Sequence, residues 1–129
     1  MRKPLNRPTD TELRILRVLW ASGPSTVRQV FDALAPGAAD LTYPAVLRMM
    51  QLMADKGLLE RDDADRSHVY RPAQPREDVQ GGLVEDLLER AFGGDALEML
   101  SAALTRGRMK PEDREAIARM LDQAEKDRS

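Results

Sequence analysis

Two runs of apolar residues at helical spacing begin the chain, and each follows the same polar signal. Thr9 with Glu12, and Thr26 with Gln29, have the separation of a capping box, in which each side chain binds the other residue's backbone N–H group. The apolar residues of the first run are Leu13, Ile15, Leu16, Leu19 and Trp20, and those of the second run are Val27, Val30, Phe31 and Leu34. Because Gly23 and Pro24 separate the two runs, the pattern predicts two short amphipathic helices.

A third helix is predicted to begin near Thr42. The Thr42 hydroxyl can cap this helix, and Pro44 lies in its first turn, where a missing N–H group costs nothing. One face is apolar and consists of Val46, Met49, Met50 and Met53. The opposite face carries Pro44, Arg48, Gln51 and Asp55. Gly57 can adopt the left-handed conformation that ends many helices.

The period of the pattern then changes from helix to strand. LLER at residues 58–61 and SHVYRP at residues 67–72 are short strand candidates, and the turn-forming sequence DDADR separates them. Three helices followed by a charged hairpin have the layout of a winged helix-turn-helix. We therefore predict a mainly α fold with a small β-hairpin wing.

The rest of the chain is predicted to be helical, with more apolar surface than its helices can bury alone. We expect these helices to form a homodimer. The residues predicted at the dimer interface are Leu83, Leu87, Leu88, Phe92, Leu97, Leu100, Ile117 and Leu121. The chain is accordingly divided into a winged-helix domain at residues 1–76 and a C-terminal helical dimerisation segment at residues 77–129.

Composition excludes several classes of function. The chain has no cysteine, which excludes disulfides and thiolate metal sites. Its single histidine, His68, offers neither a catalytic triad nor a metal centre, so we expect no catalytic residue, no metal site and no cofactor. No apolar run approaches the roughly 20 residues of a membrane span, so membrane insertion is not expected. A cytoplasmic location is the simplest interpretation.

Charge is distributed unevenly between the two halves. Residues 1–76 contain 12 Lys and Arg against 9 Asp and Glu, whereas residues 77–129 contain 8 against 13. The first half therefore carries +3 and the second half −5, although the whole chain carries only −2. A basic half joined to an acidic half suggests that the basic half faces a polyanion.

Double-stranded DNA is the polyanion that best explains the arginines. A major groove admits one α-helix, and a hairpin can place basic side chains along the neighbouring phosphates. The residues predicted to bind DNA are Arg28, Thr42, Tyr43, Pro44, Arg48, Gln51, Lys56, Arg61, Arg66, His68 and Arg71. In an alternative interpretation, the chain is a winged-helix protein-interaction module whose basic face binds an acidic partner protein.

Several longer motifs are specific in order and spacing. They are TELRILRVLW, GPSTVRQVFDAL, LTYPAVLRMMQLMADKGLLER and RSHVYRP in the first half, and FGGDALEML and MKPEDREAIARMLDQ in the second. Together they resemble the penicillinase repressor family over nearly the whole chain. The resemblance implies a homodimeric transcriptional repressor that binds a palindromic operator through its N-terminal winged helices and dimerises through its C-terminal helices.

The resemblance also implies how such a repressor is regulated. Some members are inactivated by a regulatory protease of a membrane receptor system that senses β-lactams, and others respond to copper. The cleavable members have an Asn-Phe bond where this chain has Ala102 and Ala103, and the copper-responsive members have a Cys-x-Cys motif that this chain lacks. The family's Tyr-Thr-Thr-Val sequence is replaced by residues 43–46, Tyr-Pro-Ala-Val, so the operator sequence of other members does not carry over.

Overall fold

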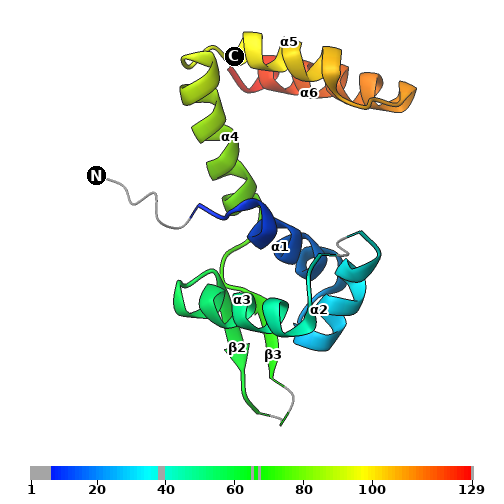
Figure 1. Cartoon of the computed structure of the whole chain (residues 1–129). Coiled ribbons are helices and arrows are strands. Elements are labelled where there is room, and N and C mark those ends of the chain that lie inside the picture. Colours follow the sequence, from blue (N-terminus) through cyan, green and yellow to red (C-terminus); the bar gives the residue numbers. More distant parts are fainter. Residues whose placement is uncertain (1–6, 38–39, 65, 67, 129) are drawn as a thin grey trace. The chain divides into compact units, whose positions relative to one another are not determined.

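The computed structural model describes residues 7–37, 40–64, 66 and 68–128, which form six α-helices and a small antiparallel sheet (Figure 1). The elements in chain order are α1 (Asp10–Ser22), β1 (Ser25–Thr26), α2 (Val27–Leu34), the 3-10 turn η2 (Ala35–Gly37), α3 (Tyr43–Asp55), β2 (Leu59–Asp62), β3 (Val69–Pro72), α4 (Arg76–Phe92), α5 (Ala96–Arg106) and α6 (Pro111–Arg128). The predicted fold class, mainly α with a hairpin wing, is confirmed.

Both predicted capping boxes are present. The Thr9 backbone N–H donates to Glu12 Oε1 at 2.9 Å, and the Glu12 N–H donates to Thr9 Oγ1 at 3.2 Å. Thr26 and Gln29 repeat the exchange at 2.8 and 3.2 Å. Each box satisfies two backbone donors that a helix start would otherwise leave without a partner. The sequence therefore specifies the beginnings of α1 and α2 locally.

One hydrophobic core holds α1, α2, α3 and the sheet together. Its buried residues are Ile15, Leu16, Leu19, Val27, Val30, Leu34, Val46, Met50, Met53, Leu58, Leu59 and Tyr70. Tyr70, from β3, is only 1% exposed and packs the sheet against the helices. Burial of an aliphatic or aromatic side chain contributes roughly 1.5–3 kcal/mol, so this core fixes how α3 and the hairpin lie relative to each other.

The sheet contains one strand that the sequence pattern did not predict. Its order is β1-β3-β2, with β3 antiparallel to both neighbours. β1 has two residues, which is too short for a hydrophobic alternation, and its Ser25 pairs with Tyr70. The β2–β3 hairpin matches the predicted wing and extends away from the helices (Figure 1). Asp65 and Ser67, within the predicted turn and second strand, lie outside the described residues.

The chain forms two compact units that divide between Val84 and Glu85, inside α4. The first unit contains the winged helix and the beginning of α4, where Val79 packs against the core. The second unit contains the remainder of α4 with α5 and α6. None of these three helices has a buried residue.

Candidate nucleic-acid interface

Helix α3 presents one face to the core and the opposite face to solvent. Val46, Met50 and Met53 are at most 1% exposed and anchor the inner face. Pro44, Arg48 and Gln51, predicted on the outer face, are all exposed. The hydrogen bond from Ala45 N–H to Thr42 Oγ1, at 3.2 Å, caps the start of the helix as predicted.

Leu52 also lies on the exposed side of α3 and was not among the predicted residues. Its side chain is 47% exposed, one turn after Arg48. The sequence could have indicated this exposure, because Leu52 is one helical turn after Arg48 and is not at an inner-face position of the helix. A leucine in this place adds an apolar contact surface beside the polar outer face.

An arginine lies against two aromatic rings where α2 meets the start of α3. The Arg28 guanidinium carbon is 4.5 Å from the centre of the Tyr43 ring and 5.8 Å from that of Phe31. The two rings pack edge to face, with centres 5.8 Å apart and an interplanar angle of 84°. Arg28 also approaches Asp32, one helical turn away, at 3.8 Å.

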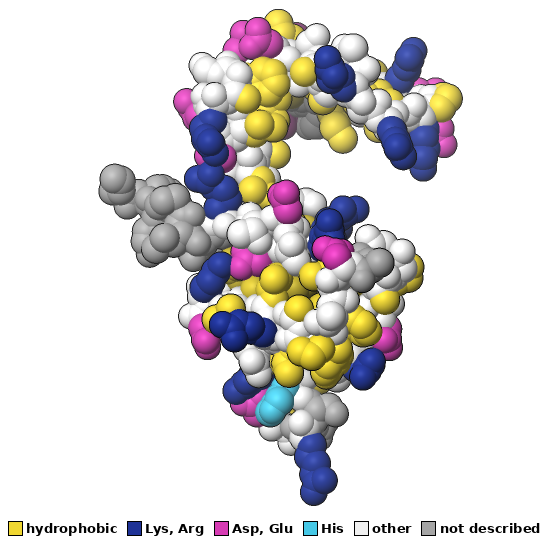
Figure 2. All heavy atoms as spheres, in the orientation of Figure 1, with side chains coloured by type: hydrophobic (Ala, Val, Ile, Leu, Met, Phe, Trp, Pro, Cys, Tyr) yellow, Lys and Arg dark blue, Asp and Glu magenta, His cyan; other side chains and the backbone are white. Residues whose placement is uncertain are grey.

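Three of the four basic residues predicted on the wing contact acidic side chains. Arg61 Nε lies 2.7 Å from Asp63 Oδ1, and the same oxygen lies 2.7 Å from His68 Nδ1. Hydrogen bonding with Tyr70, the residue opposite in β3, and then with Asp63 raises the pKa of Arg61. Arg71 pairs across the strands with Glu60 at 3.1 Å. Figure 2 shows the cyan histidine among acidic and basic side chains of the hairpin.

The arginines of the predicted site therefore fall into two groups. Arg48 and Arg66 are exposed, and neither contacts an acidic side chain within the described residues. Arg28, Arg61 and Arg71 each have an acidic partner, but these pairs are exposed on both sides. Because exposed pairs contribute little to stability, a phosphate can replace the carboxylate at small cost.

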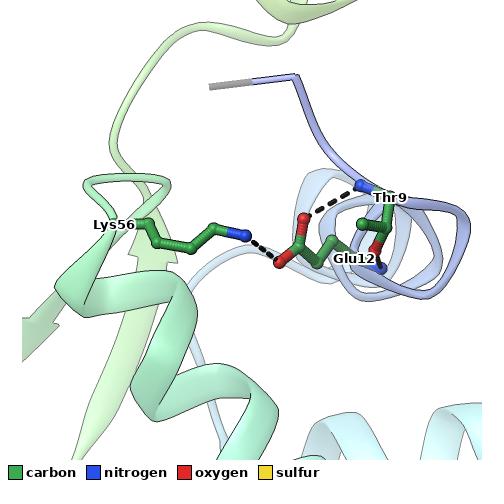
Figure 3. Close-up of polar contacts among 3 residues, drawn as sticks. All are labelled: Thr9, Glu12 and Lys56. Carbon is green, nitrogen blue, oxygen red and sulfur yellow. Dashed lines mark hydrogen bonds and ion pairs between the residues drawn. The ribbon is translucent and has the colours of Figure 1, made fainter. Parts of the chain in front are cut away.

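Lys56 differs from the other basic residues because its partner is buried. Its ammonium lies 2.6 Å from Glu12 Oε2, and the Glu12 side chain is 7% exposed. Burial acts to raise the pKa of Glu12, but the Lys56 ion pair and the Thr9 hydrogen bonds outweigh it and hold that pKa below its ordinary value. Figure 3 shows the Glu12 carboxylate held between Thr9 and Lys56. This arrangement joins the beginning of α1 to the end of α3.

The residues predicted at the dimer interface are accessible on the single chain. In α4, α5 and α6, four of them, Leu87, Leu97, Leu100 and Leu121, are exposed by 49%, 76%, 38% and 56%. The other four, Leu83, Leu88, Phe92 and Ile117, are half-buried. Leu104 and Met120, exposed by 43% and 67%, extend this apolar surface.

The described residues offer neither a metal site nor a membrane-spanning helix. No three histidine, aspartate or glutamate side chains in the described ranges are grouped closely enough to hold a metal ion. Within those ranges, no helix combines the length and the apolar character that crossing a bilayer requires.

Comparisons with known proteins give a consistent picture. The sequence pattern of the family described as penicillinase repressor matches residues 8–123. The transcriptional regulators BlaI of two Mycobacterium tuberculosis strains, CDC 1551 and H37Rv, are each 38% identical to the chain over 88 residues. The match covers 67% of this chain, and the chain spans 63% of the length of each of these relatives.

Two solved structures share the fold. The solution structure of the DNA-binding domain of the repressor BlaI superposes with a TM-score of 0.51 and 22% identity, over 60% of this chain and 93% of that one. A MarR family protein from Bacillus stearothermophilus gives a TM-score of 0.50 and 16% identity, over 93% of this chain and 74% of that one. At these identities, the two structures indicate the fold alone.

Proposed function

We propose that the chain is a transcriptional repressor that binds a DNA operator, because it belongs to the penicillinase repressor family. Membership of a family of regulators confirms the expectation that the chain is not an enzyme. The match over residues 8–123 also confirms the resemblance to this family. Repression would follow when the bound protein excludes the polymerase from the promoter.

The exposed outer face of α3 is the observation that carries the proposal. In the proposed complex α3 lies in the major groove, where a guanidinium such as that of Arg48 can bind guanine and the amide of Gln51 can bind adenine. In this complex Thr42 and Pro44, at the start of α3, would lie beside the DNA backbone. Leu52 supplies an apolar surface suited to a thymine methyl group.

The wing is proposed to bind the phosphate backbone. Arg66 can do so most readily, because among the described residues it has no acidic partner to exchange for a phosphate. Arg61, His68 and Arg71 would exchange their contacts with Asp63 and Glu60 for phosphate oxygens. Such contacts position the protein and supply affinity, whereas base contacts supply specificity.

The starts of α2 and α3 support the same orientation. Helix N-termini carry partial positive charge and usually have acidic residues nearby. In the described chain, α1, α4, α5 and α6 have acidic residues in the first turn, but α2 and α3 have none. The two helices proposed to approach the DNA therefore leave their positive ends available to an anion.

We further propose that the repressor is a homodimer formed through α4, α5 and α6. These helices expose several large apolar side chains, whereas the winged helix buries its own in a core. An isologous dimer would present two copies of α3 to the two halves of a palindromic operator. The net charge of −5 on residues 77–129 would keep this segment away from the duplex.

A regulatory protease of a membrane receptor system is the partner that the family resemblance implies. Its substrate bond would correspond to Ala102 and Ala103, which lie within α5. Because proteolysis concentrates where the chain opens, α5 would have to unfold locally before cleavage. Incubation of the full chain with such a protease, followed by mass analysis of the fragments, would test this partner directly.

Selection of bound fragments from the source genome tests the main proposal. We expect a recurrent inverted repeat, bound at least a thousandfold more tightly than a scrambled duplex at the same salt concentration, because specific sites exceed non-specific ones by about 10³–10⁷. Binding that shows no sequence preference and little salt dependence would contradict the proposal. It would favour an acidic protein as the partner of the basic face.

A further inference from the structure

The Arg28 guanidinium is held by aromatic rings rather than by an ion pair. It lies 4.5 Å from the centre of the Tyr43 ring, whereas its approach to Asp32 is 3.8 Å with both side chains more than 60% exposed. A contact of that length between exposed groups constrains a side chain weakly. A planar guanidinium over an aromatic face has both an electrostatic and a stacking preference.

The location of Arg28 is unfavourable for the stability of α2. Arg28 is the second residue of the helix, where the partial positive charge of the helix end disfavours a cation. Such departures from a local preference are expected at functional positions. The rings of Phe31 and Tyr43 compensate in part, because they hold the cation beside the start of α3.

The ring of Tyr43 is itself held in place. The ring packs edge to face on Phe31 of α2. Tyr43 is the first residue of α3 and directly follows the capping Thr42. Tyr43 is half-buried and packs against the core, so its ring has little freedom to turn. The position of Arg28 is therefore tied to the start of the proposed reading helix.

We propose that Arg28 binds a DNA phosphate beside the start of α3 and that Tyr43 is the positioning residue that orients it. This inference rests on the proposed function, and it gives Tyr43 a role different from the direct DNA contact expected from the sequence. The stacked guanidinium keeps its N–H groups at its edge free for phosphate oxygens. On binding, the phosphate replaces the exposed Asp32 carboxylate as the anion nearest the guanidinium.

The test compares full-length variants on the selected operator and on a scrambled duplex across a range of salt. Arg28→Gln should weaken binding about three- to tenfold at 0.1 M salt on both duplexes and lower the salt slope by about one. Arg119→Gln, which removes the same charge from exposed α6, is the matched control and should leave the slope unchanged.

Tyr43 is tested by the ring and by the hydroxyl separately. Tyr43→Phe keeps the aromatic face and should bind as the unmodified protein does. Tyr43→Leu should weaken binding by roughly the same factor as Arg28→Gln, and it should cause no further loss in a chain that already carries Arg28→Gln. Melting curves of each variant establish that the compared samples are folded.

Three results would contradict the role of Arg28, the role of Tyr43 or the proposed function. An unchanged slope for Arg28→Gln, with Arg48→Ala still impaired, overturns this inference and leaves the proposed function intact. Equal weakening by Tyr43→Phe and Tyr43→Leu shows that the hydroxyl contacts DNA and overturns the positioning role. An unmodified protein that prefers no duplex overturns the proposed function and this inference with it.

Discussion

Lys56 Nζ lies 2.6 Å from Glu12 Oε2, joining residues that are 44 positions apart in the sequence. Glu12 serves two partners, because its other carboxylate oxygen accepts the Thr9 backbone N–H within the capping box. Glu12 lies in the first turn of α1 and Lys56 directly follows α3, so both charges match the partial charges of their helix ends. The pair therefore links the beginning of α1 to the end of α3 beside their shared core.

We expect Lys56→Ala to affect stability rather than DNA binding. The change leaves the Glu12 carboxylate buried without its cation, which should lower the free energy of unfolding by about 1–2 kcal/mol, near the low end because Lys56 is half exposed. Urea denaturation measures this, with the exposed Lys110→Ala as control. A lowered salt slope for DNA binding by the folded variant would show instead that Lys56 contacts phosphate.

The same pair predicts how stability depends on pH. Because the pKa of Glu12 in the folded protein lies below its ordinary value of 4.5, its contribution is present above that pH and is lost as the pH falls through the lowered value. Unfolding free energies measured from pH 7 to pH 3 should fall less steeply for Glu12→Gln than for the unmodified chain. Identical acid dependence of the two proteins would mean that Glu12 does not contribute.

Arg48→Ala is expected to reduce the preference for the operator. If the guanidinium binds a guanine edge, the loss should be about 1–3 kcal/mol on the selected site and much smaller on a scrambled duplex. Fluorescence anisotropy at one salt concentration measures both affinities. An equal loss on both duplexes would assign Arg48 to phosphate, and no loss on either would remove α3 from the interface.

Two of the three arginines of the wing, Arg66 and Arg71, provide a matched comparison. Arg66→Ala should lower the salt slope of binding by about one, uniformly across sequences. Arg71→Ala also removes one positive charge, but it leaves Glu60, the cross-strand partner of Arg71, unpaired on the surface proposed to face the DNA. The resulting repulsion should make its loss of affinity the larger of the two. Restoration of affinity in a chain that carries both Arg71→Ala and Glu60→Gln would support this explanation.

The sequence predicts those parts of the fold that depend on neighbouring residues. The capping boxes at Thr9 and Thr26 and the helical cap at Thr42 involve partners three residues away, and all are present. The strand β1 was missed because its formation depends on β3, more than 40 residues later. A two-residue segment carries no periodicity of its own.

The candidate site shows the same limit. Helical spacing is enough to place Arg48 and Gln51 on the exposed face of α3. It cannot distinguish Lys56, whose charge is committed to Glu12, from Arg66, because the distinction depends on contacts between distant segments. The stacking of Arg28 on Tyr43 was hidden for the same reason, since it requires α2 and α3 to be packed.

The apolar surface that α5 and α6 expose is proposed to form part of the dimer interface. Leu97 and Leu121 are 76% and 56% exposed, so replacement of both by aspartate should cost a monomer almost nothing. In the proposed dimer the same change would bury charges. The variant should therefore sediment as a folded monomer, whereas the unmodified chain should sediment as a dimer at micromolar concentration. Its affinity for the full operator should fall by roughly 10²–10⁴, because the two half-sites are no longer linked, whereas binding to a single half-site should change little.

Truncation after Val84, which retains the contact of Val79 with the core, should likewise give a folded monomer with reduced affinity for the full operator. A full-length protein that is already monomeric at that concentration, or a truncated chain that remains dimeric, would contradict the assignment.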